Sequence, residues 1–312
     1  MKPKSLIKGD TIAVIAPASA VKKESIKTAE EAVKSLDLKP IFYPSCFMRE
    51  GHLAGPDEQR AKDINDAFKN KDIKGIFCVR GGYGTPRILD KIDYNYIKEN
   101  PKLFLGYSDI TGLHLAFNNL CNMPTLHGPM PSSESPYNKT DSYTLTSLKR
   151  NLFTNEPLGK YFSPKGEELE TVASGESTGE IIGGNLSLLT VGLGTRYQIE
   201  TKGKIIFIEE VNELNYIIDR MLTSLDLNNK FKDCAGVILG TWKNCKADKG
   251  AQDKKDSSLS KIFADIIGKH NIPIVNNFRA GHIYPQFTIP FGTKVHLNAD
   301  KREIVFLESV NQ

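Results

Sequence analysis

The sequence predicts an α/β protein of two domains, and three observations support this prediction. Apolar, β-branched runs alternate with amphipathic segments through the first half of the chain, which is the pattern of parallel strands joined by helices. The second half contains strand and helix patterns without that regular alternation. The chain is also 312 residues long, which is more than one hydrophobic core usually serves.

Short apolar runs predict the strands of the first half, at 11–16, 40–43, 75–79 and 103–105. Residues 22–36 and 57–70 carry apolar side chains at helical spacing and predict the helices between these strands. A further helix is predicted at 110–120, directly after the fourth strand. Strands and helices in this order form a parallel sheet flanked by helices.

The stretch 132–176 is polar and rich in turn residues, apart from a helical pattern at 143–152, and it predicts a connection between domains. Beyond it a helix is expected near 216–225. Strands are expected at 204–209, 236–239, 272–276, 294–297 and 303–307. The predicted organisation is an N-terminal domain at 1–150, a linker at 151–178 and a C-terminal domain at 179–312.

Composition and charge exclude several classes of function. Lysine and arginine number 41 against 37 acidic residues, and this small excess is spread along the chain, so we expect no nucleic-acid partner. The five cysteines are scattered and form no C-x-x-C pair, which predicts reduced thiols and no metal site. No pattern indicates a bound cofactor.

The first apolar run, at 11–16, superficially resembles a signal peptide. It is about six residues long, whereas a signal peptide needs an apolar core of roughly 7–15 residues. No run approaches the roughly 18–20 apolar residues of a membrane span. We therefore expect a cytoplasmic protein with no membrane partner.

Ser108 lies in a position where a serine nucleophile can be exposed. It follows an apolar strand and Gly106 and precedes a predicted helix. The backbone N–H groups at that helix start could bind a developing oxyanion. A serine followed by aspartate before a helix is more often a helix cap, however, so position alone does not decide between the two roles.

The segment Arg80-Gly-Gly-Tyr-Gly84, the glycine loop, follows the third predicted strand. Its glycines would let the backbone approach a ligand closely, although a turn that merely needs glycine conformations explains them too. The segment matches neither G-x-G-x-x-G nor a Gly-Lys-Ser/Thr ending, which disfavours nucleotide binding.

A serine nucleophile needs a base and a carboxylate that orients the base. Among six histidines, His282 lies in a predicted loop of the second domain, where a base could be presented. His114 falls within the helix after Ser108 and is expected to pack or point to solvent, and His127 to be structural or to line the substrate site. Glu209 and Glu210 end an apolar strand, where a buried carboxylate needs a partner.

Eight short segments of the chain are informative together: 13–17, 79–84, 106–109, 127–130, 183–186, 208–210, 219–222 and 281–282. They occur in the same order in the LD-carboxypeptidase family of serine peptidases, also called murein tetrapeptide carboxypeptidases. The chain resembles this family from about residue 9 to 307. The resemblance implies a flavodoxin-like N-terminal domain with a parallel sheet and a β-rich α+β C-terminal domain. It also implies a homodimer.

The resemblance assigns a role to each matching residue. It implies that Ser108 is the nucleophile and that Glu209 and His282 complete the triad. It further implies that the backbone N–H groups of Asp109 and of the Gly81-Gly82 turn form the oxyanion hole. The family usually has Glu-Asp where this chain has two glutamates in succession.

The activity implied by the resemblance is hydrolysis of the amide bond before a terminal D-amino acid. In the family this reaction releases D-Ala from the murein tetrapeptide during cell-wall recycling, through an acyl-enzyme and without a metal or cofactor. Such an enzyme must bind the free carboxylate of a small peptide. Arg80 is the candidate on its charge, with Tyr83 and His127 as further substrate-binding candidates.

Two other functions remain open. Microcin-immunity-type relatives cleave an amide in a peptidyl-nucleotide antibiotic and carry an aromatic residue that stacks on the base. Here Trp242 begins the predicted loop 241–258, although a tryptophan is more often a core or interface residue. A non-catalytic, two-domain ligand binder would need neither Ser108 nor His282.

Overall fold

The structure is a computed structural model that describes residues 1–132, 142–247 and 258–312, and it divides into two compact units. The N-terminal unit comprises Met1–Pro157, Tyr284–Gly292 and Ser309–Gln312, and the C-terminal unit comprises Leu158–Ile283 and Thr293–Glu308. Residues 133–141 of the turn-rich stretch predicted at 132–176, and most of the loop predicted at 241–258, lie outside the described residues.

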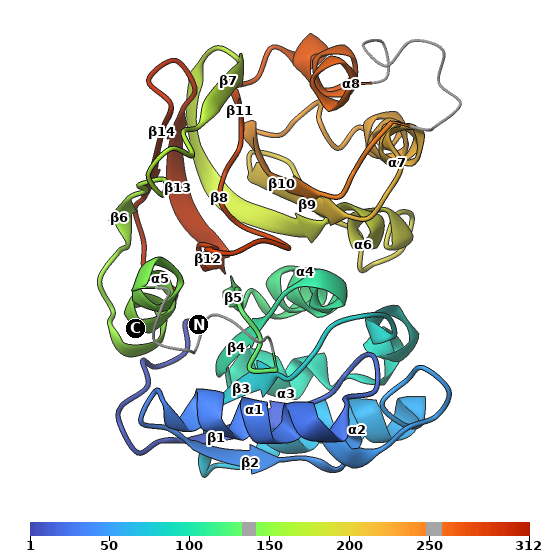
Figure 1. Ribbon diagram of the computed structural model, residues 1–312, viewed down its shortest axis with the longest axis vertical. Helices are drawn as coiled ribbons and strands as arrows, with labels where there is room; N and C mark the ends of the chain where they lie inside the picture. The colour runs from blue at the N-terminus through green and yellow to red at the C-terminus, as the bar shows by residue number, and fades with distance from the viewer. Residues whose placement is uncertain (133–141, 248–257) are drawn as a thin grey trace. The chain divides into compact units, whose positions relative to one another are not determined.

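The N-terminal unit is built on a six-stranded sheet with the order β12-β5-β4-β3-β1-β2 (Figure 1). Its strands are β1 (Thr11–Ile15), β2 (Lys39–Phe42), β3 (Ile73–Cys78), β4 (Leu103–Gly106), β5 (Thr125–His127) and β12 (Ile289–Phe291). The first five are parallel in the flavodoxin order 2-1-3-4-5, and β12 pairs antiparallel with β5. The predicted flavodoxin-like parallel sheet is confirmed.

Helices cover both faces of this sheet because successive strand side chains point to opposite faces. Leu103 and Leu105 of β4 belong to one buried cluster with residues of α1 (Lys23–Lys34) and α5 (Ser142–Phe153). Phe104, between them, faces the other side, where its ring lies 4.9 Å from that of Phe117. The helices on that side are α2 (Asp57–Lys69), α3 (Tyr94–Glu99) and α4 (Thr111–Cys121). Short 3-10 helices complete the unit: η1 (Pro44–Phe47), η2 (Thr85–Lys91) and η3 (Ser108–Ile110).

The C-terminal unit contains an eight-stranded mixed sheet with the order β6-β14-β13-β8-β9-β10-β11-β7 (Figure 1). Its strands are β6 (Gly159–Lys160), β7 (Glu170–Ala173), β8 (Glu176–Asn185), β9 (Ile205–Val211), β10 (Gly236–Lys243), β11 (Ile274–Asn276), β13 (Thr293–Asn298) and β14 (Glu303–Phe306). Strands β8 to β11 are parallel and the outer strands are antiparallel. The helical elements are α6 (Leu186–Val191), α7 (Asn215–Leu227), α8 (Leu259–Ile266) and η4 (Gly268–His270).

The segment 151–178, which the sequence suggested as a linker, contains β6, β7 and the start of β8. Strand β6 has two residues and β7 has four, and every one of them is at least partly exposed. Edge strands this short bury too little apolar surface to produce a sequence pattern. Their register is set by pairing with β14 and β11 instead.

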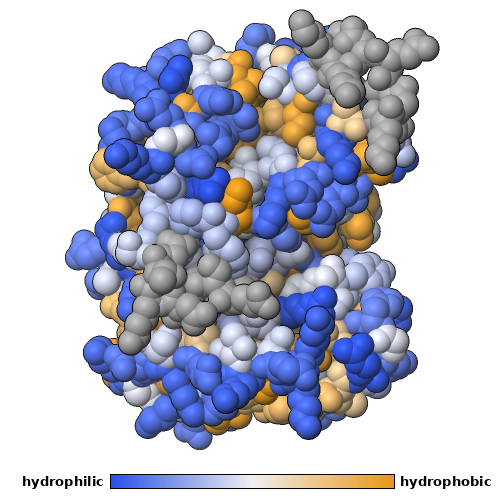
Figure 2. All heavy atoms as spheres, viewed as in Figure 1, coloured by the Kyte–Doolittle hydropathy of each residue, from blue (hydrophilic) through white to orange (hydrophobic). Residues whose placement is uncertain are grey.

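The surface fits a folded globular chain. The face shown in Figure 2 is mostly hydrophilic, with apolar residues scattered between polar ones. Among the described residues, no helix combines the length and apolar character needed to span a bilayer.

Strands β8 and β9 approach closely at Gly183, within the Gly183-Gly-Asn-Leu186 segment that the sequence singled out. The residue has φ +137°, and a Cβ built on it would lie only 1.9 Å from the carbonyl oxygen of Phe207. The neighbouring atom is backbone within a sheet, so it cannot move aside cheaply. Only glycine permits the pairing that places the end of β9.

We expect Gly183→Ala to destabilise the C-terminal unit by about 3 kcal/mol or more, because it adds a backbone clash to an unfavourable φ. Gly203→Ala is the matched control, since Gly203 also has positive φ (+68°) but nothing lies within 4 Å of its added Cβ. The control should cost only about 1–2 kcal/mol. Urea unfolding of both variants measures the difference, and equal midpoints would contradict the packing argument.

Candidate active site

Ser108 lies in a strained turn at the carboxyl end of β4. It is the first residue of η3 and has φ +66°, a region that L-residues other than asparagine and aspartate seldom adopt. Helix α4 begins three residues later, and its N-cap residue is Ile110, which makes no side-chain cap hydrogen bond. Ser108 is therefore not the cap of that helix. A strained turn between strand and helix is the conformation that exposes a serine nucleophile.

The glycine loop lies directly against this turn. A Cβ built on Gly81 would lie 3.0 Å from Ser108 Cβ and 3.3 Å from its Oγ, so the loop backbone contacts the serine side chain. The Gly82 position, with φ +106°, packs equally closely on Ser19, and Ser19 Oγ accepts a hydrogen bond from the Tyr83 N–H at 3.0 Å. The loops after β1 and β3 thus meet at the topological switch point of the sheet, where α/β proteins bind ligands.

Two of the substrate-binding candidates are exposed on the glycine loop. The Arg80 guanidinium donates one hydrogen bond to the Ala20 carbonyl at 2.7 Å, which fixes its direction while the residue stays exposed. Tyr83 is 48% exposed, and its ring lies 5.7 Å from the His52 ring. Both side chains are therefore available to a ligand at the end of the sheet.

The third candidate, His127, is fully buried on β5. Its ring lies among aromatic neighbours, 5.3 Å from Phe291, 6.0 Å from Tyr107 and 6.1 Å from His114. Of the two roles that the sequence left open for His127, burial in such a cluster favours the structural one.

His114 is buried rather than exposed, and it supports the end of β4. Burial lowers the pKa of His114 to about 4, against the opposing effect of its hydrogen bond to Gly106, so the ring is neutral at pH 7. Its Nε2 lies 2.9 Å from the Gly106 carbonyl oxygen. Because a carbonyl only accepts, Nε2 must carry the proton. The residue two positions before Ser108 is thereby anchored.

Glu209 and His282 form a buried pair in the C-terminal unit. Glu209, near the end of β9, is fully buried, and its Oε2 lies 2.7 Å from His282 Nδ1. Burial by itself lowers the pKa of His282. The charge of Glu209 and the hydrogen bond to it together raise the pKa by more than burial lowers it, so the net shift is upward from 6.5. Because the carboxylate accepts from Nδ1–H, Nε2 is the ring nitrogen of neutral His282 that can take up a proton.

The loop before His282 fits closely around the carboxylate. Gly281 has φ +106°, and a Cβ on it would lie 2.7 Å from Glu209 Oε2. The preceding Ala280 carbonyl accepts hydrogen bonds from Thr241 N–H at 3.2 Å and from Thr241 Oγ1 at 3.0 Å. These contacts explain why glycine precedes the histidine. No sequence pattern had indicated this role for Thr241.

Glu210, the neighbouring carboxylate, has a different set of partners. It accepts hydrogen bonds from Asn185 Nδ2 at 2.8 Å, from Ser187 N–H at 2.9 Å and from Ser187 Oγ at 2.7 Å. Burial raises its pKa, and these hydrogen bonds oppose the rise. Adjacent strand residues point to opposite faces, so Glu210 anchors the start of α6 while Glu209 meets His282.

Within each unit the structure therefore brings together part of the candidate set. Gly81 adjoins Ser108 in the N-terminal unit, and Gly82 and Asp109 are their next residues in sequence. Glu209 and His282 adjoin in the C-terminal unit. Among the residues described, no group of three or more histidine, cysteine, aspartate or glutamate side chains is arranged to hold a metal ion.

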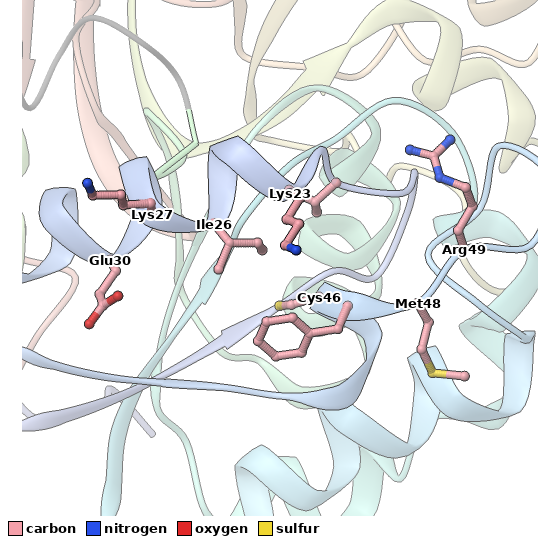
Figure 3. A pocket seen from close by; sticks show the side chains of 9 residues that line it. Lys23, Ile26, Lys27, Glu30, Cys46, Met48 and Arg49 are labelled. Carbon is pink, nitrogen blue, oxygen red and sulfur yellow. The ribbon is translucent and has the colours of Figure 1, made fainter.

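A cavity of about 510 Å³ lies elsewhere in the N-terminal unit, between α1 and η1 (Figure 3). It is lined by Val21, Lys23, Ile26, Lys27, Glu30, Cys46, Phe47, Met48 and Arg49. None of these residues is a candidate from the sequence. Burial raises the pKa of the Cys46 thiol well above its usual value, so this thiol is not a nucleophile at neutral pH.

Comparison with known proteins identifies the family of this chain independently of the site geometry. The family described as LD-carboxypeptidase matches the chain twice, its N-terminal domain at residues 12–128 and its C-terminal domain at residues 178–297. The chain is 36% identical over 311 residues to the probable murein peptide carboxypeptidase of Bacillus subtilis, covering 100% of this chain and 96% of that protein.

Two further similar proteins carry different names, one that of an immunity protein and the other that of a carboxypeptidase. The chain is 27% identical to the Microcin C7 self-immunity protein of Escherichia coli, covering 96% of this chain and 94% of that protein. The solved structure of muramoyltetrapeptide carboxypeptidase from Oxalobacter formigenes superposes with a TM-score of 0.81 at 26% identity, over 96% of this chain and 99% of that one. With both domains matched in order and a full-length relative above 30% identity, the chain belongs to the LD-carboxypeptidase family.

Proposed function

We propose that this protein is a serine-type LD-carboxypeptidase in which Ser108, Glu209 and His282 form the catalytic triad. The observation that carries the proposal is the 2.7 Å hydrogen bond between a fully buried Glu209 carboxylate and His282 Nδ1. A carboxylate bound to one imidazole nitrogen fixes the tautomer and the ring direction, and it stabilises the imidazolium that forms during proton transfer. This is the orienting half of a triad.

In the proposed reaction, His282 Nε2 takes the hydroxyl proton as Ser108 Oγ attacks the scissile carbonyl. The oxyanion is stabilised by backbone N–H groups of Asp109 and of Gly81 and Gly82. The imidazolium then protonates the leaving amine, and water hydrolyses the acyl-enzyme with His282 again acting as base. The positive φ of Ser108 and its contact with Gly81 support this assignment.

Ser108 and His282 belong to different units, and the proposed mechanism requires them to meet in one site. The chain enters the N-terminal unit at Tyr284, two residues after His282. It then forms β12, which pairs with β5, the neighbour of β4 in the sheet. This short covalent connection supports the proposal.

The proposed substrate is a small murein peptide with a terminal D-amino acid. The Bacillus subtilis relative and the Oxalobacter formigenes structure both carry names of murein peptide carboxypeptidases. The exposed Arg80 guanidinium, already directed by its hydrogen bond to Ala20, is the proposed ligand for the terminal carboxylate. The proposed mechanism uses no metal or cofactor.

The proposed setting is the cytoplasm, where the five cysteines would stay reduced. All five lie in the described residues and form no disulfide, and four of them are buried. A homodimer is proposed on family resemblance.

A second candidate function follows from the Escherichia coli relative, which is named a Microcin C7 self-immunity protein. Enzymes of that type cleave an amide in a peptidyl-nucleotide. The sequence placed Trp242 at the start of a loop, although it favoured a core or interface role for this residue. The loop boundary is wrong, because Trp242 lies in β10. Its ring packs 4.8 Å from Phe263, so the side chain is engaged in the fold. The peptide therefore remains the preferred substrate.

The purified protein should release D-Ala from a synthetic murein tetrapeptide that ends in D-Ala and leave the same peptide ending in L-Ala intact. An aminoacyl-sulfamoyl adenylate, incubated in parallel, should be cleaved more slowly. Chromatography of the released amino acid or nucleoside measures all three reactions. Preferential cleavage of the adenylate would favour the second candidate function, and cleavage of none would contradict both.

We expect Ser108→Ala and His282→Ala each to lower kcat by roughly 10⁴-fold or more, with the double variant little worse, because the triad acts as a unit. Ser108→Gly should be equally inactive yet more stable, by about 1 kcal/mol, since glycine relieves the positive φ. Ser224→Ala is the control, because that hydroxyl donates to the Arg220 carbonyl in an exposed hydrogen bond on α7. Unimpaired D-Ala release by Ser108→Ala would refute the nucleophile assignment.

The raised pKa of His282 predicts a rate that depends on pH. A general base must be neutral, so kcat/KM should fall as pH drops through the raised pKa, with a midpoint above 6.5. Glu209→Gln should move the midpoint to lower pH and reduce kcat by roughly 10³–10⁴-fold. Glu210→Gln should shift it less, because Glu210 affects the imidazole more weakly.

The pH dependence of kcat/KM gives the midpoint in wild type. NMR titration of the His282 ring measures its pKa in the Glu209→Gln and Glu210→Gln variants. A midpoint below 6.5 in wild type, or equal shifts in the two variants, would count against the Glu209–His282 pair as the source of the raised pKa.

A further inference from the structure

Arg60 is a charged side chain with no exposed surface, and it joins three loops of the N-terminal unit. Its Nη1 donates to the carbonyl oxygens of Pro17, at 2.6 Å, and Gly84, at 2.9 Å. Its Nε donates to the Gly55 carbonyl at 3.3 Å, and Nη2 pairs with Asp57. The planar guanidinium thereby holds the loop after β1 and the end of the glycine loop at one fixed separation.

Thr85 and Asp109 form a reciprocal pair next to this arginine. The Thr85 N–H donates to Asp109 Oδ2 at 2.8 Å, and Thr85 Oγ1 donates to the Asp109 carbonyl oxygen at 2.6 Å. Both residues are buried, Thr85 at 0% and Asp109 at 1% exposure. Two hydrogen bonds therefore connect the residue after the glycine loop to the residue after Ser108.

Helix α4 packs tightly on the same pair. A Cβ built on Gly112, in the first turn of α4, would lie 2.9 Å from Thr85 Oγ1. Thr85 thus occupies a space bounded by the glycine loop, the Ser108 turn and the start of the helix.

The Ser108 turn requires such support. Its positive φ is unfavourable, and a strained backbone persists only where the surrounding structure holds it. In the proposed mechanism the oxyanion hole uses the N–H groups of Gly81 and Gly82, which precede Thr85 in the chain, and the N–H group of Asp109 itself. The distance between these N–H groups depends on how the glycine loop and the Ser108 turn are joined.

We propose that the side chains of Arg60, Thr85 and Asp109, the loop clamp, are positioning residues that hold the glycine loop against the Ser108 turn and set the spacing of the oxyanion donors. This inference deepens the proposed function and rests on it. None of the three side chains touches the reacting atoms, and each acts through the backbone of a neighbouring residue.

Hydrogen–deuterium exchange tests the clamp without reference to any activity. Thr85→Val removes the hydroxyl donor and keeps the volume and β-branching, and Asp109→Asn removes the charge that accepts from Thr85 N–H. In both variants the amides of residues 81–85 and 87 should exchange about tenfold faster than in wild type. Thr85→Ser, which retains the hydroxyl, should stay within about threefold of wild type. Unchanged exchange in Thr85→Val and Asp109→Asn would overturn the clamp.

Kinetics on the D-Ala tetrapeptide test its role in positioning. Thr85→Val should lower kcat by about 10–100-fold and change KM by less than about threefold, because displaced donors weaken transition-state binding rather than substrate binding. Thr85→Ser should restore kcat. Arg60→Lys, which keeps the charge and loses the planar fork, should lower kcat in the same way.

Thr171→Val is the matched control for these measurements. Thr171 Oγ1 also donates to a backbone carbonyl at 2.6 Å, that of Ala299, but it lies on β7 in the C-terminal unit. A wild-type kcat in Thr85→Val, or an equal loss in Thr171→Val, would overturn the positioning role. If the wild-type protein released no D-Ala, the proposed function would fail, and exchange alone would then decide whether the clamp holds the loops.

Discussion

The local structure of the C-terminal unit depends on the burial of Glu209. A carboxylate without exposed surface is costly unless a cationic or donor group compensates it, and His282 is the partner that the fold supplies. The partner must approach closely, and Gly281 permits this because any side chain there would collide with the carboxylate. Thr241 then holds the preceding carbonyl. One buried charge thus dictates the conformation of a loop that is distant from β9 in sequence.

Glycine at positive φ recurs at several positions where the backbone packs closely on a neighbouring residue. Gly82 and Gly84 belong to the loop beside Ser108, Gly281 adjoins Glu209, and Gly183 brings β8 against β9. A Cβ at any of these four positions would lie within 3.0 Å of a neighbouring atom. The conformational freedom that glycine loses on folding lowers stability. These glycines therefore lower stability at positions where close packing of the backbone requires them.

The sequence predicted those elements whose stability comes from local pattern, and it missed those that depend on distant partners. The buried runs of β1, β3 and β4 are continuous and apolar, so their parallel arrangement could be predicted. Strand β12 contains Pro290 and has three residues, and it exists because β5, more than 150 positions earlier, pairs with it. The sequence could have revealed Arg60, which precedes the apolar Ile64 by one helical turn and so shares its buried face.

Two pairs of adjacent residues, one pair in each unit, divide their roles in the same way. In Ser108-Asp109 and in Glu209-Glu210, the first residue is proposed to take part in catalysis and the second is buried with its charge used for anchoring. Asp109 binds Thr85 beside the glycine loop, and Glu210 binds Asn185 and Ser187 at the start of α6. Glu209 and Glu210 are both buried, but successive strand side chains point to opposite faces, so each meets different partners. Pattern alone cannot tell these two acids apart, because their difference lies in their partners.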